Sequence, residues 1–516
     1  MENNMKKILF ILLAVSLILS SCFDKTADES TNAETKADEV IDSSCFHADD
    51  DDNGKCDKCT GSVLATLDFY AINDLHGKFV DTSANEGVDE LTTYLKNCTS
   101  ADDHSVILSS GDMWQGTSES NLTKGKLITD WMNEIDVVSM TLGNHEFDWG
   151  CEFIKENKEI AEFPFLAINV YDRTTKQRAD FCTPSVLVQR GNVTIGIIGA
   201  IGDCYSSISP DKVEDVFFKT GDELTNLVKT ESTKLRADGA DIIVYSVHDG
   251  YGRTKSGVSS VSGNEIASYY DVSLSRDGYV DLVFEGHTHR SYVLKDPYGV
   301  YHLQDGGDNQ GISHVEVEVN FANSNVKTGT AEFISIDKYD SLKDDPIVSE
   351  LLEKYKDDIA QGGLSIGNNK YKRSGDEMRR LVAETYYKKG VEKWGSRYDI
   401  ALGGGFVSIR SPGYLAKGEV TYAMVQTLFP FDNPLVLCSI KGSDLLNKFI
   451  NTNNSNYFVY CKEDLGQIDE NGTYYVVVDT YTSQYAPNNL KEIEMYSESI
   501  FARDLVADYI AAGGLS

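Results

Sequence analysis

Residues 64–76 read Leu-Ala-Thr-Leu-Asp-Phe-Tyr-Ala-Ile-Asn-Asp-Leu-His, an apolar run that ends in groups able to hold a cation. The run Leu64–Ile72 has the composition of a buried strand, and Asp74 and His76 come just after it. Residues i and i+2 of an extended chain project to the same side, so these two side chains can grip one ion.

The same arrangement recurs further along the chain. Apolar runs end just before each of four more polar motifs, which are Gly111-Asp112, Gly143-Asn144-His145-Glu146-Phe147-Asp148, His248 and Gly286-His287-Thr288-His289. Together with His76 of the first motif, five of the nine histidines of the chain fall in these five motifs. A single motif of this kind is usually a surface or structural feature, but the five together predict one shared metal centre.

The apolar runs also predict the fold. They are Leu64–Ile72, Ser105–Leu108, Val137–Leu142, Val193–Ile201, Asp241–Val247 and Val280–Phe284. Between them, Val88-Leu91-Leu95 and Leu224-Leu227-Leu235 have helical spacing, which predicts an α/β layered domain. The strict alternation of His314–Phe321 predicts a strand with one buried face, and so a second sheet packed on the first. Sites in such folds lie beyond the carboxyl ends of the strands.

These motifs resemble those of the calcineurin-like metallophosphoesterases, over about Leu64 to Phe321. The resemblance implies an αββα two-sheet sandwich that holds two divalent cations. Carried over residue by residue, it implies that one cation is bound by Asp74, His76 and His289 and the other by Asn144, His248 and His287, with Asp112 as the bridge.

The residue types suit this chemistry. Two dications about 4 Å apart can acidify a shared water, so that a metal-bound hydroxide attacks the ester, and can neutralise charge on the phosphoryl oxygens. The mixed nitrogen and oxygen ligands suit Zn, Mn, Fe or Co.

His145, with Asp148 three residues on, is predicted to stabilise the transition state or protonate the leaving oxygen, and the resemblance assigns the same pair. A purely structural Asp148, capping the next turn, is the alternative.

The C-terminal part mixes helices and strands and is predicted to be a separate α+β domain. Its Gly403-Gly404-Gly405-Phe-Val-Ser-Ile-Arg410 and Phe429-Pro-Phe431-Asp-Asn433 segments resemble substrate-binding motifs of the bacterial 5′-nucleotidase, UDP-sugar hydrolase and 2′,3′-cyclic phosphodiesterase branch. The predicted substrate-binding residues are Gly404, Gly405, Arg410, Phe431, Asn433, Tyr481 and Tyr485. Arg410 offers a fork of donors for phosphate, and Phe431 offers a face for a nucleobase.

Two features of this part leave alternatives open. Phe431 could instead be a core aromatic, and the glycine run could be only a turn. Where that branch carries a Gly-Gly-Asp-Gly-Tyr-like segment for the ribose and base, this chain has Tyr481-Thr-Ser-Gln-Tyr485.

The resulting hypothesis is a 5′-nucleotidase that releases phosphate from nucleoside 5′-phosphates. The alternatives are the same hydrolysis on a cyclic nucleotide, UDP-sugar, sugar phosphate or thiosulfate ester, or an inactive surface-binding lipoprotein. The formal charge of −34, from 81 acidic and 47 basic residues, excludes a protein that coats nucleic-acid polymers, but bound cations still permit a small anionic substrate.

The N-terminus reads as an export signal. Residues 1–21 have two early lysines and a short apolar stretch, and they end before Cys22, which is predicted to carry lipid and to anchor the protein outside the cytoplasm. An ordinary signal peptide is the alternative. The predicted order is then a polar tether at 22–62, the hydrolase domain at 63–340, a linker helix at 341–363 and a nucleotide-binding domain at 364–516.

The tether contains a cluster of possible ligands, Cys45, His47, Cys56 and Cys59, around the acidic stretch Asp49–Asp52. The Cys-x-His and Cys-x-x-Cys pairs could close a tetrahedral zinc site. Calcium bound by the aspartates, or disulfides, are the alternatives. Beyond Cys22, the nine remaining cysteines are an odd number, which argues against a framework made only of disulfides.

Overall fold

The computed structural model describes residues 47–81, 86–101, 104–251, 273–485, 489–497 and 499–515. The predicted signal peptide, Cys22 and Cys45 lie outside these residues. Among the described residues, no helix has both the length and the apolar character that a membrane span requires.

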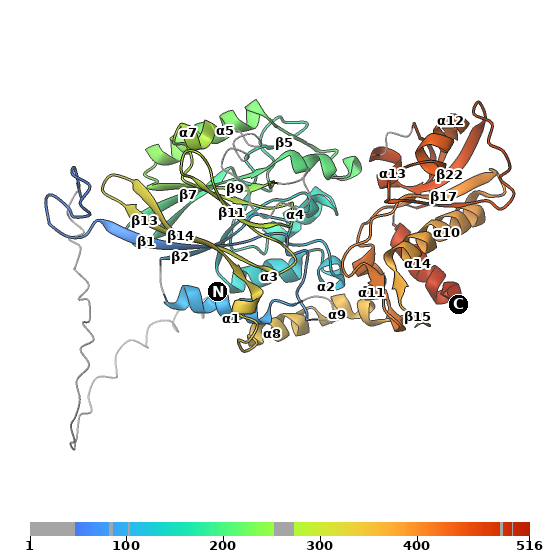
Figure 1. The fold of residues 1–516 in the computed structure, drawn as a ribbon, viewed down its shortest axis with the longest axis horizontal. Coiled ribbons are helices and arrows are strands. Elements are labelled where there is room, and N and C mark those ends of the chain that lie inside the picture. The colour runs from blue at the N-terminus through green and yellow to red at the C-terminus, as the bar shows by residue number, and fades with distance from the viewer. Residues whose placement is uncertain are drawn as a thin grey trace, which may run out of the picture. The chain divides into compact units, whose positions relative to one another are not determined.

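Two six-stranded sheets form the core of the N-terminal domain (Figure 1). The strands of the first sheet, in spatial order, are β14 (Asn325–Ser335), β13 (Gly311–Asn320), β1 (Leu64–Ile72), β2 (Ser105–Ser109), β3 (Val137–Thr141) and β4 (Phe165–Leu166). Those of the second are β11 (Ser291–Lys295), β12 (Tyr301–Asp305), β10 (Leu282–Glu285), β9 (Ile242–His248), β7 (Val193–Ile201) and β6 (Ser185–Arg190). A ribbon of β5 (Val170–Asp172) and β8 (Val216–Phe218) lies apart.

The alternation of side chains along β1 shows why the two sheets stack. Leu67, Phe69 and Ala71 point into the core between the sheets, whereas Tyr70 and Ile72 face the helices on the other side. In the second sheet, β9 divides its side chains in the same way, with Ile242 and Val244 facing the first sheet.

Helices cover both outer faces (Figure 1). On the first sheet lie α1 (Asp89–Ala101), α3 (Lys126–Glu134) and α4 (Cys151–Lys158), and on the second lie α5 (Asp222–Ala237) and α7 (Ser273–Arg276), while α2 (Ser118–Leu122) packs beside α3. The predicted αββα sandwich is therefore confirmed.

The segment predicted as one linker helix is broken into pieces. It contains α8 (Pro346–Lys354), α9 (Lys356–Ile359) and a 3-10 turn at Ala360–Gly363. Asp345 begins α8, because its carboxylate accepts the Ile347 N–H at 2.9 Å, and Tyr355 ends α8. Val348 and Leu351 pack into the core beneath α3, so this segment is anchored to the sandwich.

The C-terminal domain contains a five-stranded sheet in the order β21 (Tyr457–Cys461), β17 (Ile400–Phe406), β22 (Thr473–Asp479), β20 (Leu435–Lys441) and β23 (Lys491–Met495). Its helices are α10 (Gly375–Trp394), α11 (Tyr422–Leu428), α12 (Gly442–Asp444), a π-helical turn at Leu445–Ile450, α13 (Thr480–Tyr485) and α14 (Ala502–Tyr509). Two small ribbons pair β15 (Ser365–Asn369) with β19 (Gly418–Thr421) and β16 (Arg373–Ser374) with β18 (Tyr414–Leu415). This is the predicted mixed α+β domain.

A buried histidine ties two strands of the second sheet together. His302 of β12 lies 2.8 Å from the Glu285 carboxylate of β10 and 3.6 Å from Asp296. Burial alone would lower the pKa of His302, but Asp296 and Glu285 raise it to about 9. Strand pairing in this sheet therefore includes a buried charged group.

Replacing Phe69 by alanine should lower the free energy of unfolding by about 3–5 kcal/mol, because its fully buried ring meets Phe284 of the opposite sheet. Chemical denaturation measures this change. Leu187→Ala is the matched control, since Leu187 is 41% exposed on β6 and should cost less than about 0.5 kcal/mol. Equal losses in the two variants would contradict the assignment of Phe69 to the inter-sheet core.

The charged His302 should make stability depend on pH. The pKa of an unfolded histidine is near 6.5. The charged His302 therefore stabilises the folded protein fully below that pH, and this stabilisation is lost as the pH rises towards about 9. The difference in free energy of unfolding between wild type and His302→Gln should therefore shrink by roughly 2–3 kcal/mol over this range. Denaturation curves at several pH values measure it, and a difference that stays constant would refute the charged state.

Candidate metal centre

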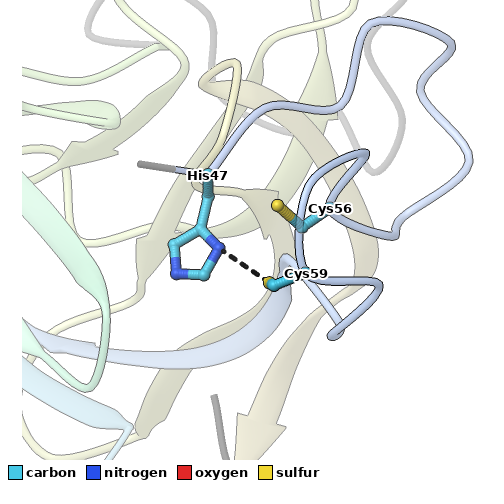
Figure 2. Close-up of side chains that lie close together, drawn as sticks. All are labelled: His47, Cys56 and Cys59. Atoms are coloured by element: carbon cyan, nitrogen blue, oxygen red, sulfur yellow. Dashed lines mark hydrogen bonds between the residues drawn. The ribbon is translucent and has the colours of Figure 1, made fainter. Parts of the chain in front are cut away.

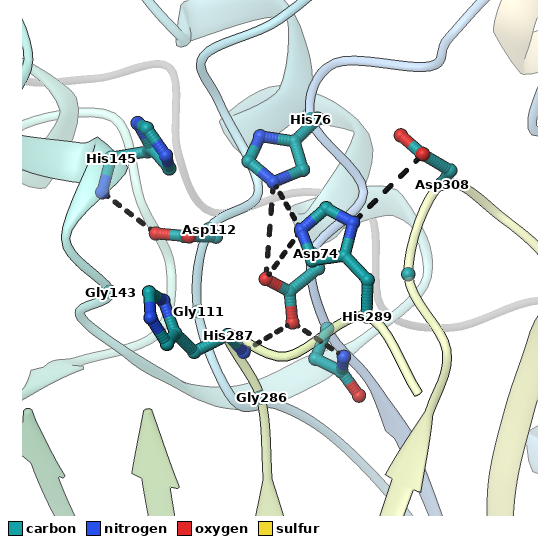
Figure 3. Close-up of polar contacts among 12 residues, drawn as sticks. Asp74, His76, Gly111, Asp112, Gly143, His145, Gly286, His287, His289 and Asp308 are labelled. Carbon is teal, nitrogen blue, oxygen red and sulfur yellow. Dashed lines mark hydrogen bonds and ion pairs between the residues drawn. The ribbon is translucent and has the colours of Figure 1, made fainter. Parts of the chain in front are cut away.

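The predicted ligands come together at one edge of the sandwich. The strands β1, β2 and β3 run parallel in the first sheet, as do β7, β9 and β10 in the second. The loops after β1, β2 and β3 therefore meet the loops after β9 and β10 at the carboxyl ends of both sheets. Figure 3 shows the resulting cluster of imidazoles and carboxylates.

The backbone of these loops is unusual. Asp74, His76, Asp112, His287 and His289 all have left-handed conformations, with φ between 50° and 72°. Non-glycine residues rarely adopt this region, and each such residue costs about 1–3 kcal/mol. The surrounding structure thus forces five of the seven predicted ligands into strained positions that point their side chains at one another.

One group consists of Asp74, His76 and His289, whose ligand atoms all lie within 4.8 Å of one another. The Nε2 atoms of the two histidines are 3.0 Å apart, and the Asp74 Oδ1 atom lies 3.3 Å from His289 Nε2. His76 Nδ1 donates to the Gln115 carbonyl at 2.7 Å, so its Nε2 lone pair faces the centre.

A second group adjoins the first. The ligand atoms of Asp74, Asp112 and His248 also lie within 4.8 Å of one another, and His248 Nε2 is 3.0 Å from Asp112 Oδ2. His248 Nδ1 donates to the Ser110 carbonyl at 2.6 Å, which again turns Nε2 towards the centre. His287 lies beside His248, with ring centroids 5.5 Å apart.

These donor sets fit divalent cations. Among the described residues, the buried Asn144 Oδ1 accepts no hydrogen bond, and neither does the buried Asp74 Oδ1. Burial alone would raise the pKa of Asp112, but His248 and His145 hold it well below its usual range. The centre therefore gathers buried carboxylates, imidazoles and an amide oxygen, which are groups that divalent cations bind.

His145 and Asp148 form the predicted pair beside this centre. The His145 N–H donates to Asp112 Oδ1 at 2.7 Å, and its ring Nδ1 lies 2.7 Å from Asp148 Oδ2. Arg410 of the C-terminal domain donates from Nη2 to His145 Nε2 at 2.7 Å. Because a guanidinium can only donate, Nε2 accepts and the ring proton lies on Nδ1, where Asp148 orients it.

A cavity of about 320 Å³ opens onto these residues, a volume suited to a small-molecule ligand. Its lining comes from both domains. The sandwich contributes Asp112, Asn144, His145, Asp148, His287 and His289, and the C-terminal domain contributes Arg410, Phe431, Asn433 and Tyr481, among others.

The aromatic and cationic groups of the C-terminal wall lie close together. The Arg410 guanidinium is 5.4 Å from the centre of the Phe431 ring, which is 6.0 Å from that of His145. Among the described residues, the buried Arg410 Nε has no hydrogen-bond partner. Phe431 is half-buried and Phe429 is buried in the core, and both line the cavity.

Two predicted contacts lie elsewhere. Gly404 and Gly405 are buried in β17, outside the residues that line the cavity, and the run is a strand rather than a turn. Glycine is needed there because a Cβ at 404 would meet the Phe458 carbonyl and one at 405 the Thr482 side chain. Their contact with substrate stays a prediction. Tyr485 ends α13, and its side chain lies outside the described part of the chain.

Supporting residues were missed by the sequence reasoning. The buried carboxylate of Glu146 accepts the backbone N–H groups of Asp112, Met113, Trp114 and Gly143 at 2.7–3.3 Å. Glu146 thereby joins the loops after β2 and β3. Its position inside the Gly-Asn-His-Glu motif is the sequence feature that could have identified it. Cys204 was also unforeseen, although its Sγ lies within 4.8 Å of ligand nitrogens of His248 and His287.

Comparison with known proteins agrees with this geometry. Residues 67–291 match the family model of the calcineurin-like phosphoesterases. Protein UshA of Yersinia enterocolitica is 25% identical over 414 residues, 72% of each chain, and a 5′-nucleotidase of Vibrio vulnificus is 24% identical over 387 residues, 66% of each chain. The crystal structure of a 5′-nucleotidase precursor from Thermus thermophilus superposes with a TM-score of 0.65 at 20% identity, covering 87% of this chain and 96% of that one.

The family match covers the five strand-end motifs, and the structural match extends over both domains. Residues 67–291 are therefore similar to the calcineurin-like phosphoesterases, and this similarity indicates a phosphoester hydrolase.

Proposed function

We propose that the centre holds two divalent cations, of Zn, Mn, Fe or Co. One is held by Asp74, His76 and His289, the other by Asn144, His248 and His287, and Asp112 bridges them. When bound, such a pair supplies Lewis acidity and neutralises charge on the phosphoryl group. The buried Oδ1 atoms of Asp74 and Asn144, which accept no hydrogen bond from the described residues, and the left-handed backbone of five ligands support this assignment.

His145 is proposed to act on the leaving group. Asp148 keeps the ring proton on Nδ1 and stabilises the imidazolium, while Nε2 faces the cavity next to Arg410. Once a substrate phosphate binds the guanidinium in place of His145, Nε2 can take up a proton from solvent and pass it to the leaving oxygen, which returns the ring to its neutral Nδ1–H form. Arg410 Nε, which has no partner among the described residues, offers a further donor to the same phosphate.

The substrate is proposed to be a nucleoside 5′-phosphate, hydrolysed to nucleoside and phosphate. The observation that carries this is the cavity itself, because it joins the polar groups of His145 and Arg410 to the ring of Phe431. Phe431 and Tyr481 offer faces for the base, and Asn433 offers hydrogen bonds to it. The 5′-nucleotidase from Vibrio vulnificus, which matches 66% of this chain, supports this choice.

The cellular setting follows from the sequence alone. The proposal places the enzyme outside the cytoplasm, with residues 1–21 removed and lipid on Cys22. It also keeps the division into a tether at 22–62, a hydrolase domain at 63–340, a linker at 341–363 and a nucleotide-binding domain at 364–516.

Substituting His145 by alanine should lower kcat for AMP by about 10²- to 10⁴-fold while metal content stays normal, because the ring is assigned to proton transfer. Steady-state kinetics and metal analysis on the same preparation test this. His104→Ala is the control, since His104 precedes Ser105 at the opposite end of β2. Undiminished turnover in His145→Ala would remove the proposed role.

The nucleotide assignment can be tested with AMP, a cyclic nucleotide, UDP-glucose and an aryl phosphate, each with added Mn²⁺. AMP should be the best substrate. Phe431→Ala should raise KM for AMP by roughly 5- to 150-fold, since stacking on a base is worth about 1–3 kcal/mol, and should leave KM for the aryl phosphate nearly unchanged. Equal changes for the two substrates would show that Phe431 does not recognise the base.

A further inference from the structure

Residues His47–Ser62, here called the knuckle, form a compact turn just before β1. Its backbone closes through the bonds Cys56 N–H to Gly61 O at 2.8 Å, Thr60 N–H to Cys56 O at 2.8 Å and Asp57 N–H to Ala48 O at 2.7 Å. A bridge between Lys55 and Ser62 completes a small hairpin. The Cys-x-x-Cys pair therefore lies in a tight turn, and the segment at His47 and Ala48 is held beside it.

Three potential ligands converge inside the knuckle (Figure 2). The ligand atoms of His47, Cys56 and Cys59 all lie within 4.8 Å of one another, and His47 Nδ1 is 3.6 Å from Cys59 Sγ. A tetrahedral ion with Zn–S near 2.3 Å and Zn–N near 2.0 Å separates its sulfur and nitrogen ligands by about 3.6 Å. The observed spacing fits that geometry.

The two cysteines of the knuckle are thiols. Neither Cys56 nor Cys59 forms a disulfide, and the same holds for the other cysteines that the structure describes. Two such sulfurs beside an imidazole are ligand types that structural zinc sites use.

The neighbouring aspartates have other partners. The Asp49 carboxylate accepts the N–H groups of Asn53 and Gly54 at 3.0 and 2.9 Å and the side chain of Asn320 at 2.6 Å. Asp52 binds Asn325 at 2.7 Å, and the His47 ring meets Phe321 edge-on at 5.7 Å. Asp49 and Asp52 therefore dock the knuckle on the β13–β14 hairpin, whereas the two thiols and the imidazole form a separate set with the ligand types that zinc prefers.

We propose that the knuckle binds one Zn²⁺ through His47 Nδ1, Cys56 Sγ and Cys59 Sγ, separately from the catalytic centre. Binding releases the thiol protons and forms two Zn–S bonds and one Zn–N bond. The ion cross-links the chain on both sides of the acidic stretch and so holds the segment before β1 against the sandwich. Its role is structural, and it stands whether or not the proposed substrate is correct.

The test uses the full chain loaded with Co²⁺, whose spectrum distinguishes thiolate ligands from oxygen and nitrogen ligands. We expect a sulfur-to-cobalt charge-transfer band that Zn²⁺ abolishes, and that is lost in Cys56→Ser and in Cys59→Ser. Zinc-loaded protein should lose about one equivalent of zinc in each variant. Cys461→Ser is the matched control, because Cys461 is another half-buried thiol outside the knuckle and should change neither reading.

Activity and proteolysis measurements distinguish loss of the zinc site from misfolding of the variants. Phosphatase activity should persist in Cys56→Ser, since the knuckle is remote from the catalytic residues, while trypsin should cut faster at the exposed Lys55 or Lys58 once zinc is lost. A charge-transfer band that survives in both cysteine variants would overturn the proposal. So would a Cys56–Cys59 disulfide in thiol titration of the purified protein, or calcium in place of zinc on metal analysis.

Discussion

Two carboxylates, Asp74 and Asp112, are fully buried at the edge where the two sheets meet, and the rest of the structure depends on neutralising them. Water cannot solvate charges at that depth, and an isolated buried charge costs several kcal/mol. The groups that face them from the second sheet are His248 at the end of β9 and His287 and His289 after β10. The sheets must therefore stack with their carboxyl ends on the same side, and the apolar core between them makes that possible.

The C-terminal domain contributes residues to the site. Arg410 reaches His145, so a residue of one domain sets the hydrogen bonding of the residue proposed for proton transfer in the other. Other bonds hold the domains together, among them Lys124 to Asp432 at 2.7 Å and Ser118 to Gln426 at 2.9 Å. Because the cavity has walls from both domains, neither domain alone contains the site.

The parts of this arrangement that the sequence predicted are those with a local signal. The strands, the polar motifs after them and the sandwich follow from continuous apolar runs and from motifs a few residues long. Glu146 was missed because accepting four N–H groups from two loops is a tertiary property that no local pattern carries. The linker was predicted as one helix since its apolar spacing continues past Tyr355, where the backbone in fact ends α8. Gly404 and Gly405 were predicted to bind substrate; the structure packs them against Phe458 and Thr482 in β17, a tertiary constraint that the glycine run alone does not reveal.

The left-handed backbone at five of the proposed ligands has a consequence for how ions are exchanged. A flexible loop must be ordered by its ion, so the ion's affinity is reduced by the entropy of that ordering. Here the ligand loops take up their strained conformation when the chain folds, so the donor atoms already converge before an ion binds. Ion size and preferred coordination geometry therefore decide which metal is selected, rather than the ability of the ion to order the loops.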